Sequence, residues 1–285
     1  MTSDRTLLII TGPTAVGKTA YTIERAMELG TPIISADSRQ MYREMRIGTA
    51  APTDEELARV RHYFIGNLSI HDYYNVSMFE RQALELLETL FVDHPVVIMT
   101  GGSPQYIEAV CHGMDELPDP NPKIRQYVSR LFQTSGVEAL RAQVATLDPD
   151  YFSRVNPNDH KRMMRAIEVS LQMGRPYSQC LHQVRRRRDF KIEKYYLNRP
   201  REALFDRISR RVDAMMGQGL LEEARRLLPY RHLNALNTVG YKELFGYFDG
   251  RCSLEQAVED IKTHTRRYAK RQLTWFKRGY TEKLL

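Results

Sequence analysis

Short apolar runs alternate with longer amphipathic stretches at the start of the chain. The runs at residues 7–11, 32–36 and 96–100 have the length and composition of buried strands. Between them, helical spacing of apolar positions predicts one helix that ends near Leu29 and another at 78–91. Strands that alternate with helices pair in parallel and carry helices on both faces. The pattern therefore predicts an α/β fold with a parallel sheet flanked by helices.

The pattern changes after residue 117. A turn cluster at 118–122 is rich in proline, and residues 123 to about 183 are almost wholly helical. We interpret this region as an all-helical insertion domain within the α/β core. The predicted boundaries are 118–189 for the insertion, and 1–117 with 190–285 for the core.

Beyond the insertion, residues 190–197 form a predicted returning strand. Helices are expected over the remainder, including 201–228 and a long helix from 253 to about 277. The last of these helices is strongly basic.

Composition adds few constraints. The 285 residues suit one large or two modest domains, and 42% hydrophobic with 27% charged residues is typical of a soluble globular protein. No apolar run has the length of a membrane helix. Residues 1–6 are polar and lead directly into the first strand, so we expect no signal peptide, a cytoplasmic location and no membrane partner. Nothing in the sequence requires more than a monomer.

A glycine-rich motif follows the first predicted strand and precedes the first predicted helix. It has the form G-x-x-x-x-G-K-[ST] of a phosphate-binding loop. In such loops backbone N–H groups and the helix N-terminus surround phosphate oxygens, and the lysine adds a compact cation. The final hydroxyl can bind a magnesium ion, so Thr19 is the predicted Mg²⁺ ligand. The predicted di- or triphosphate site comprises Gly12, Pro13, Thr14, Ala15, Val16, Gly17, Lys18 and Thr19.

Asp37 is the acidic residue at the end of the second predicted strand. Ligands of parallel sheets bind in a crevice beyond the carboxyl ends of the strands, where Gly12, Asp37 and residues 101–103 are expected to meet. Phosphate-loop kinases usually place a second acid there, yet strand 96–100 leads only into Gly-Gly-Ser. Asp37 can therefore be a metal ligand or a general base. The plain alternative is a helix cap.

Ser103 and three arginines are further candidates. Ser103 can donate to a phosphate oxygen, although Gly-Gly-Ser is equally typical of an ordinary turn. Arg207 and Arg211 lie four residues apart on one face of a predicted helix, close to Arg210. Arginine suits the charge of a departing pyrophosphate. The alternative is a solvated charged face.

Positive charge is concentrated in two later regions. The chain has 42 Lys and Arg against 35 Asp and Glu, a net charge of +7. Such an excess is compatible with nucleic-acid binding once its position is known, and a solvated surface is the alternative. The basic residues are Arg267, Lys270, Arg271 and Arg278, with Thr274 on the same helix face, and Lys161, Arg162, Arg165 and residues 185–188 in the insertion.

Taken in order, these segments closely resemble the bacterial tRNA dimethylallyltransferases, also called tRNA isopentenyltransferases or the MiaA family. The resemblance covers essentially the whole chain. One departure is Ser103, where the family usually has threonine, so the hydroxyl is kept and the methyl is lost. The zinc-finger extension of eukaryotic relatives is absent, and Cys111, Cys180 and Cys252 have no metal-ligand spacing. Besides the loop, the matching blocks are residues 34–42, 47–50, 157–159 with 162 and 165–168, 237–242 and 269–276.

The resemblance implies a reaction and roles for residues. The loop would hold dimethylallyl diphosphate, and N6 of the adenosine beside the tRNA anticodon would attack the allylic carbon. Asp37 would accept or orient the N6 proton, while Thr19, Ser103, Arg211 and Mg²⁺ would act at the leaving diphosphate. The implied contacts with the tRNA anticodon stem-loop are Asp37, Ser38, Arg39, Gln40, Ser103, Arg125, Lys161, Arg162, Met163, Met164, Arg165, Asn237, Thr238, Val239, Gly240, Tyr241 and Lys242.

Three other classes share part of this pattern. A phosphate-loop nucleotide or small-molecule kinase has the same loop and sheet but needs a second metal-binding acid. A transferase acting on free adenine nucleotide would not need the insertion or the basic helix. An RNA-binding module without activity would leave the phosphate loop and Asp37 without a role.

Overall fold

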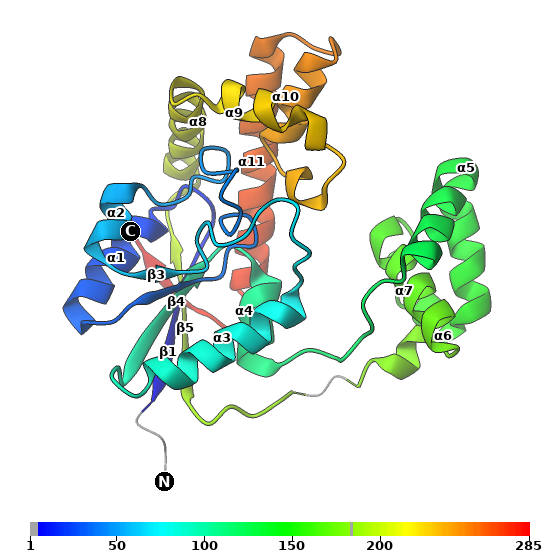
Figure 1. The fold of residues 1–285 in the computed structure, drawn as a ribbon, viewed down its shortest axis with the longest axis horizontal. Coiled ribbons are helices and arrows are strands. Elements are labelled where there is room, and N and C mark those ends of the chain that lie inside the picture. The colour runs from blue at the N-terminus through cyan, green and yellow to red at the C-terminus, as the bar shows by residue number, and fades with distance from the viewer. Residues whose placement is uncertain (1–4, 183–184) are drawn as a thin grey trace. The chain divides into compact units, whose positions relative to one another are not determined.

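The computed structural model describes residues 5–182 and 185–285. The chain forms two compact units, one made of Met1–Cys111 with Arg187–Leu285 and one made of His112–Arg186 (Figure 1). The predicted insertion, 118–189, begins and ends a few residues later than the second unit. Gln183, where the predicted helical stretch ends, lies outside the described residues.

The first unit is built on a parallel six-stranded sheet, as predicted. The strand order is β3-β2-β4-β1-β5-β6, and every pairing between neighbours is parallel. β1 is central, with Thr6 opposite Val96 on one side and Lys191 on the other. The strands are β1 (Thr6–Thr11), β2 (Ile33–Ser35), β3 (His62–Tyr63), β4 (Val96–Gly101), β5 (Lys191–Asn198) and β6 (Thr281–Leu284).

Alternate residues of β1 face two different cores. Leu7 and Ile9 pack with α3 and α4, whereas Leu8 and Ile10 pack with α1 and α8. Because both faces are covered, the strand is apolar without interruption, which is why its sequence reads as a continuous run. The helices of this unit are α1 (Lys18–Leu29), α2 (Asp54–Arg59), α3 (Val76–Leu90), α4 (Pro104–His112), α8 (Arg201–Gly217), α9 (Leu220–Leu227), α10 (Tyr241–Phe248) and α11 (Leu254–Phe276).

Two predictions for the C-terminal part are wrong. The single helix expected at 201–228 is α8 and α9, because Gly219 takes a left-handed conformation with φ 97° and interrupts it. The residues after the basic helix were expected to be helical as well, but Thr281–Leu284 is strand β6. All four residues are exposed and only Leu284 is apolar, so the segment carries no apolar strand signal.

The second unit is helical and has its own core. Its elements are α5 (Pro122–Leu147), α6 (Pro149–Phe152), α7 (His160–Met173) and the short 3₁₀ turn Tyr177–Cys180. Val128, Leu140, Met163 and Ile167 pack between α5 and α7. α5 is two helices joined at Gly136, whose φ of 69° breaks the helical path.

Across the part of the chain that the structure describes, no helix is both long enough and apolar enough to cross a membrane.

Candidate active site

The loop between β1 and α1 has the backbone that its glycines predict. Gly12 has φ 148°, and a Cβ there would lie 2.6 Å from the Leu197 carbonyl of neighbouring β5. Gly17 has φ 108° at the N-cap of α1. Neither position accepts a larger residue without strain. The loop is therefore shaped by the sheet beside it as well as by its own sequence.

Cationic side chains hold the carbonyls of this loop. Lys18 Nζ donates to Gly12 O at 2.9 Å and to Pro13 O at 3.0 Å. The guanidinium Nε atoms of Arg207 and Arg199 donate to the carbonyls of residues 15 and 16, both at 2.8 Å. These bonds fix the loop and offset carbonyl dipoles that would repel an anion. Arg199 had no sequence signal, since it lies 183 residues from its partner.

Lys18, Arg211 and Asp37 form a charge cluster at the loop. Burial, and next the positive charge of Arg211, lower the pKa of Lys18 to about 8, while Asp37 opposes the shift. Burial also lowers the pKa of Arg211, with Asp37 opposing and Arg207 adding to the decrease. Two partly buried cations beside one carboxylate leave net positive charge, which favours an anionic ligand.

Asp37 follows β2 and does not cap a helix. Its Oδ1 accepts a hydrogen bond from Arg39 N at 3.0 Å, which closes a turn. The helix-cap alternative is therefore excluded, because residues 38–41 are turn residues. Metal ligand and general base both stay open for Asp37.

Ser103 lies next to the Asp37 turn. A Cβ at Gly101 would come within 2.3 Å of Ala36 O, so the ends of β2 and β4 touch at a glycine. Ser103 Oγ accepts from Ser38 N at 3.0 Å and donates to Ser38 Oγ at 3.1 Å. The loop after β1, the turn after β2 and the turn after β4 thus occupy one edge of the sheet, where Asp37 and Ser103 are neighbours.

Two residues of α11 complete this region. Gln272 bonds both Thr14 N and Gly102 O, and Tyr268 OH donates to Gly102 O at 3.2 Å. Burial, with Asp37 contributing, raises the pKa of Tyr268. Neither residue was assigned a role from the sequence.

The predicted tRNA contacts of the first unit are Ser103 and two segments, residues 37–40 and 237–242. Gln40 Nε2 donates to the carbonyls of Thr49 and Ala50, at 3.2 and 3.0 Å. The Tyr241 side chain is fully buried, and its hydroxyl donates to Glu223 at 2.7 Å. We therefore interpret Tyr241 as a residue that holds its segment rather than one that touches RNA. In that segment, Asn237 and Lys242 are exposed, Thr238 and Val239 are partly buried and Gly240 is buried.

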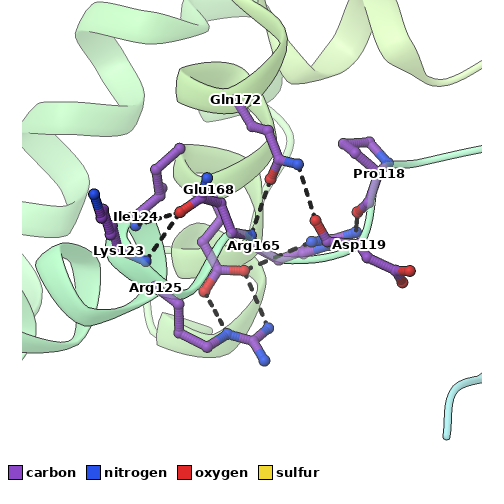
Figure 2. A network of polar contacts seen from close by, with 9 residues as sticks. Pro118, Asp119, Lys123, Ile124, Arg125, Arg165, Glu168 and Gln172 are labelled. Carbon is purple, nitrogen blue, oxygen red and sulfur yellow. Dashed lines mark hydrogen bonds and ion pairs between the residues drawn. The ribbon is translucent and has the colours of Figure 1, made fainter. Parts of the chain in front are cut away.

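In the second unit the predicted contacts divide between packing and exposure. Met163 is fully buried in the helical core, Met164 is partly buried, and Lys161 and Arg162 are exposed. Figure 2 shows that Arg125 and Arg165 both approach the buried carboxylate of Glu168.

Distances define this network. Arg125 donates to both carboxylate oxygens of Glu168, at 3.1 and 3.2 Å, while Arg165 Nη1 lies 3.6 Å from one of them. Arg165 Nη2 also donates to Pro118 O at 2.9 Å. Both arginines therefore stabilise the helical unit, whatever else they contact.

The basic clusters also divide. Arg267, Lys270, Arg271 and Thr274 are exposed on α11, and Arg278 is exposed just beyond its end. In the arginine run, Arg188 forms a buried ion pair with Glu80 at 2.8 Å and donates to two carbonyls of α4. Neither nucleic-acid binding nor a solvated surface describes Arg188, because its side chain is only 10% exposed.

The parallel sheet and the loop between β1 and α1 define a phosphate-loop α/β protein. Its carboxylate and two partly buried cations lie at the carboxyl end of the sheet. The profile of the family described as IPP transferase matches residues 40–279. The chain belongs to this family.

Named relatives agree over nearly the full length. The chain is 50% identical over 272 residues to tRNA dimethylallyltransferase 2 of Parabacteroides distasonis, covering 95% of this chain and 91% of that protein. It is 49% identical over 280 residues to tRNA dimethylallyltransferase 2 of Porphyromonas gingivalis, covering 98% and 93%.

A solved structure has the same fold. The tRNA isopentenylpyrophosphate transferase from Bacillus halodurans superposes with a TM-score of 0.71 at 33% identity, covering 99% of this chain and 89% of that chain. A eukaryotic dimethylallyltransferase superposes with a TM-score of 0.78 at 24% identity, covering 99% and 73%. Both comparisons confirm the predicted α/β architecture.

Proposed function

We propose that the protein transfers the dimethylallyl group of dimethylallyl diphosphate to N6 of the adenosine that follows the anticodon of tRNA, releasing diphosphate. The observation that carries this proposal is the Asp37 carboxylate beside Lys18 and Arg211 at the phosphate loop. Such an arrangement combines a proton acceptor with cations for a departing anion. Relatives named tRNA dimethylallyltransferase, about half identical to this chain, support the substrates.

The diphosphate end of the donor binds at the loop. Backbone N–H groups at the start of α1 and the side chains of Lys18 and Arg211 face its negative charge. As the allylic C–O bond breaks, charge grows on the diphosphate oxygens, and these cations stabilise it. Ser103 lies in the adjacent turn, and its hydroxyl can donate to a diphosphate oxygen when its hydrogen turns away from Ser38 Oγ.

The acceptor adenine approaches from the side of Asp37. Its N6 attacks the allylic carbon and passes its proton to the Asp37 carboxylate, whose second oxygen has no hydrogen bond among the described residues. The base must first leave the anticodon stack, at a cost of a few kcal/mol. Proximity of the two bound substrates repays this cost.

Mg²⁺ fits the residues present. The Thr19 hydroxyl and the Asp37 carboxylate are hard oxygen donors, and the described residues contain no group of three His, Cys, Asp or Glu side chains that could hold a metal ion. Such a scarcity of ligands suits an ion held mainly by diphosphate oxygens. When bound, Mg²⁺ would neutralise charge on the leaving group. Thr19 is its proposed protein ligand.

The tRNA anticodon stem-loop is proposed to contact the exposed basic residues of α11 and the helical region predicted at 118–189. Lys161 and Arg162 are two of the exposed cations there, and Asn237 with Lys242 add a segment of the first unit. Phosphate contacts of this kind supply affinity and position the target base. A monomer acting in the cytoplasm is sufficient for this reaction.

A kinase is the rival proposal, and the turn after β4 argues against it. Gly101, Gly102 and Ser103 stand where the second metal-binding acid is expected. No phosphoryl group moves in prenyl transfer, so that acid is not needed.

The test is one incubation of the protein with Mg²⁺, dimethylallyl diphosphate and unmodified tRNA, read by nucleoside mass spectrometry. We expect a five-carbon gain on one adenosine beside the anticodon. Hydrolysis of ATP or movement of a phosphate, without this gain, would support the kinase instead. The matched control is the Asp37→Asn variant, which keeps the shape and removes the base.

A further inference from the structure

Gln272 of α11 is a buried amide that joins two parts of the proposed active site. Its Oε1 accepts a hydrogen bond from Thr14 N at 2.9 Å, and its Nε2 donates one to Gly102 O at 2.8 Å. Thr14 belongs to the phosphate loop after β1, and Gly102 belongs to the turn after β4. Gln272 is 3% exposed, so its bond to Gly102 is shielded from water, and its bond to Thr14 is partly shielded. We propose that Gln272 is a positioning residue that keeps the phosphate loop and the turn after β4, which carries Ser103, aligned for prenyl transfer.

The amide group suits this task because it carries an acceptor and a donor in one rigid plane. Shape supports the same conclusion, since a Cβ at Gly102 would lie 2.6 Å from Gln272 Nε2. Because residue 102 is a glycine, the Gln272 amide has room to reach the Gly102 carbonyl. Tyr268, one helical turn earlier on α11, donates to the same carbonyl.

From Gly102 the contacts continue to the reacting groups. Ser103 follows Gly102 directly, and its N donates to Ala36 O at 3.3 Å. Its hydroxyl accepts from Ser38 N at 3.0 Å, so Asp37 lies between two residues held by Ser103. A shift of the Gly102 turn therefore also moves Asp37.

From Thr14 the contacts continue to the cationic end of the site. Lys18 Nζ bonds the carbonyls of Gly12 and Pro13, the two residues before Thr14. The Thr14 peptide and these carbonyls belong to one short loop. Its orientation therefore depends on Gln272 at one side and on Lys18 at the other.

Removing the amide leaves the Thr14 N–H without its partner and leaves the Gly102 carbonyl with Tyr268 as its remaining donor. An unsatisfied group is costly, so the loop and the turn would shift to find water or one another. A misplacement of about 1 Å can lower a rate by roughly a hundredfold. The expected effect is thus on alignment of the substrates, beyond any loss of stability.

The experiment compares Gln272→Met with Gln256→Met, a matched control on the exposed face of the same helix, where Gln256 bonds Asp260. We measure kcat and KM for prenyl transfer, and Kd for inorganic pyrophosphate by calorimetry. For Gln272→Met we expect kcat to fall about ten- to hundredfold and pyrophosphate to bind several-fold more weakly. The control should match wild type. A folded Gln272→Met variant with wild-type kcat and pyrophosphate affinity would overturn the proposal.

A second variant tests the same bond from the other side and guards against misfolding of the first. Gly102→Ala displaces Nε2 and should reproduce the fall in kcat. A double variant then combines Gly102→Ala with Ser103→Ala. Its fall in kcat should be smaller than the product of the two single falls, because both substitutions act through one turn. Fully multiplicative losses would mean that Gln272 acts independently of Ser103, against the proposal.

This inference rests on the proposed function, and the two can fail separately. If wild-type protein does not prenylate tRNA, the proposed function fails. Pyrophosphate binding needs neither tRNA nor turnover, so it still tests whether Gln272 orients the phosphate loop.

Discussion

Arginines in the two units of this protein have different surroundings. Arg125 and Arg165 of the helical unit approach the carboxylate of Glu168, which is 5% exposed. Arg207 and Arg199 at the phosphate loop donate to backbone carbonyls and, among the described residues, form no ion pair with a carboxylate. The paired arginines stabilise a fold, whereas the loop arginines retain donors for an anion.

The same distinction separates buried charges that stabilise from buried charges that act. Arg188 and Glu80 neutralise each other, but Lys18 and Arg211 are two partly buried cations with one acidic group, Asp37, in their charge cluster. An excess of buried charge of one sign is unfavourable without a ligand. The excess positive charge of Lys18 and Arg211 therefore indicates where an anionic substrate would bind and neutralise it.

Among the substitutions that test this comparison, replacement of Asp37 should have the largest effect on kcat. Asp37→Ala removes the proposed base and should lower kcat by about 10²- to 10⁴-fold. It also removes the only negative charge of the cluster, so pyrophosphate should bind as well as or better than in wild type. Single-turnover prenyl transfer and calorimetry measure the two effects. Equal loss of pyrophosphate binding in the presence of Mg²⁺ would instead assign Asp37 to the metal.

Arginine substitutions in the two units should then separate catalysis from stability. Arg211→Gln should lower kcat/KM by roughly 10²- to 10³-fold through lost stabilisation of the leaving group, with little change in thermal stability. Arg125→Gln should reduce the free energy of unfolding by about 1–3 kcal/mol, because Glu168 loses its bidentate partner. Pyrophosphate affinity should not change in Arg125→Gln. A reversed pattern would contradict the division described above.

The pKa of Lys18 predicts a pH dependence of donor binding. Its pKa is lowered to about 8, so the free protein loses this positive charge as the pH rises through 8. Pyrophosphate affinity should therefore decrease above pH 8, by about tenfold over a pH unit or more. Lys18→Arg, charged throughout, is the control for titration of pyrophosphate itself. Parallel pH profiles of both proteins would rule out Lys18 as the titrating group.

The smallest predicted effect concerns the exposed cations of the helical unit. Replacing Lys161 and Arg162 together by alanine should weaken tRNA binding and reduce its salt slope by about 1 for each phosphate that is no longer neutralised. Arg25→Ala, an exposed cation of α1 paired with Glu28, is the matched control. An unchanged salt slope in the double variant would show that these two residues do not bind the RNA.

Local signals predicted much of this structure. The phosphate loop could be predicted because its motif comprises eight consecutive residues. Asp37 could be predicted because it follows an apolar strand. Gln272 and Arg199 carried no comparable signal, since their partners lie 258 and 183 residues away. β6 was missed for a different reason, because its polar edge strand depends on pairing with β5. Burial of Met163 and Tyr241 likewise follows from packing that a single sequence does not show.

The distance along the chain between Thr14 and Gln272 has a consequence during synthesis. The phosphate loop leaves the ribosome before its partner on α11, which follows 258 residues later. At typical elongation rates this interval lasts on the order of tens of seconds. During that time the nascent chain carries a phosphate-binding motif without the helix that orients it. The two contacts of Gln272 with Thr14 and Gly102 therefore form only after α11 has been made.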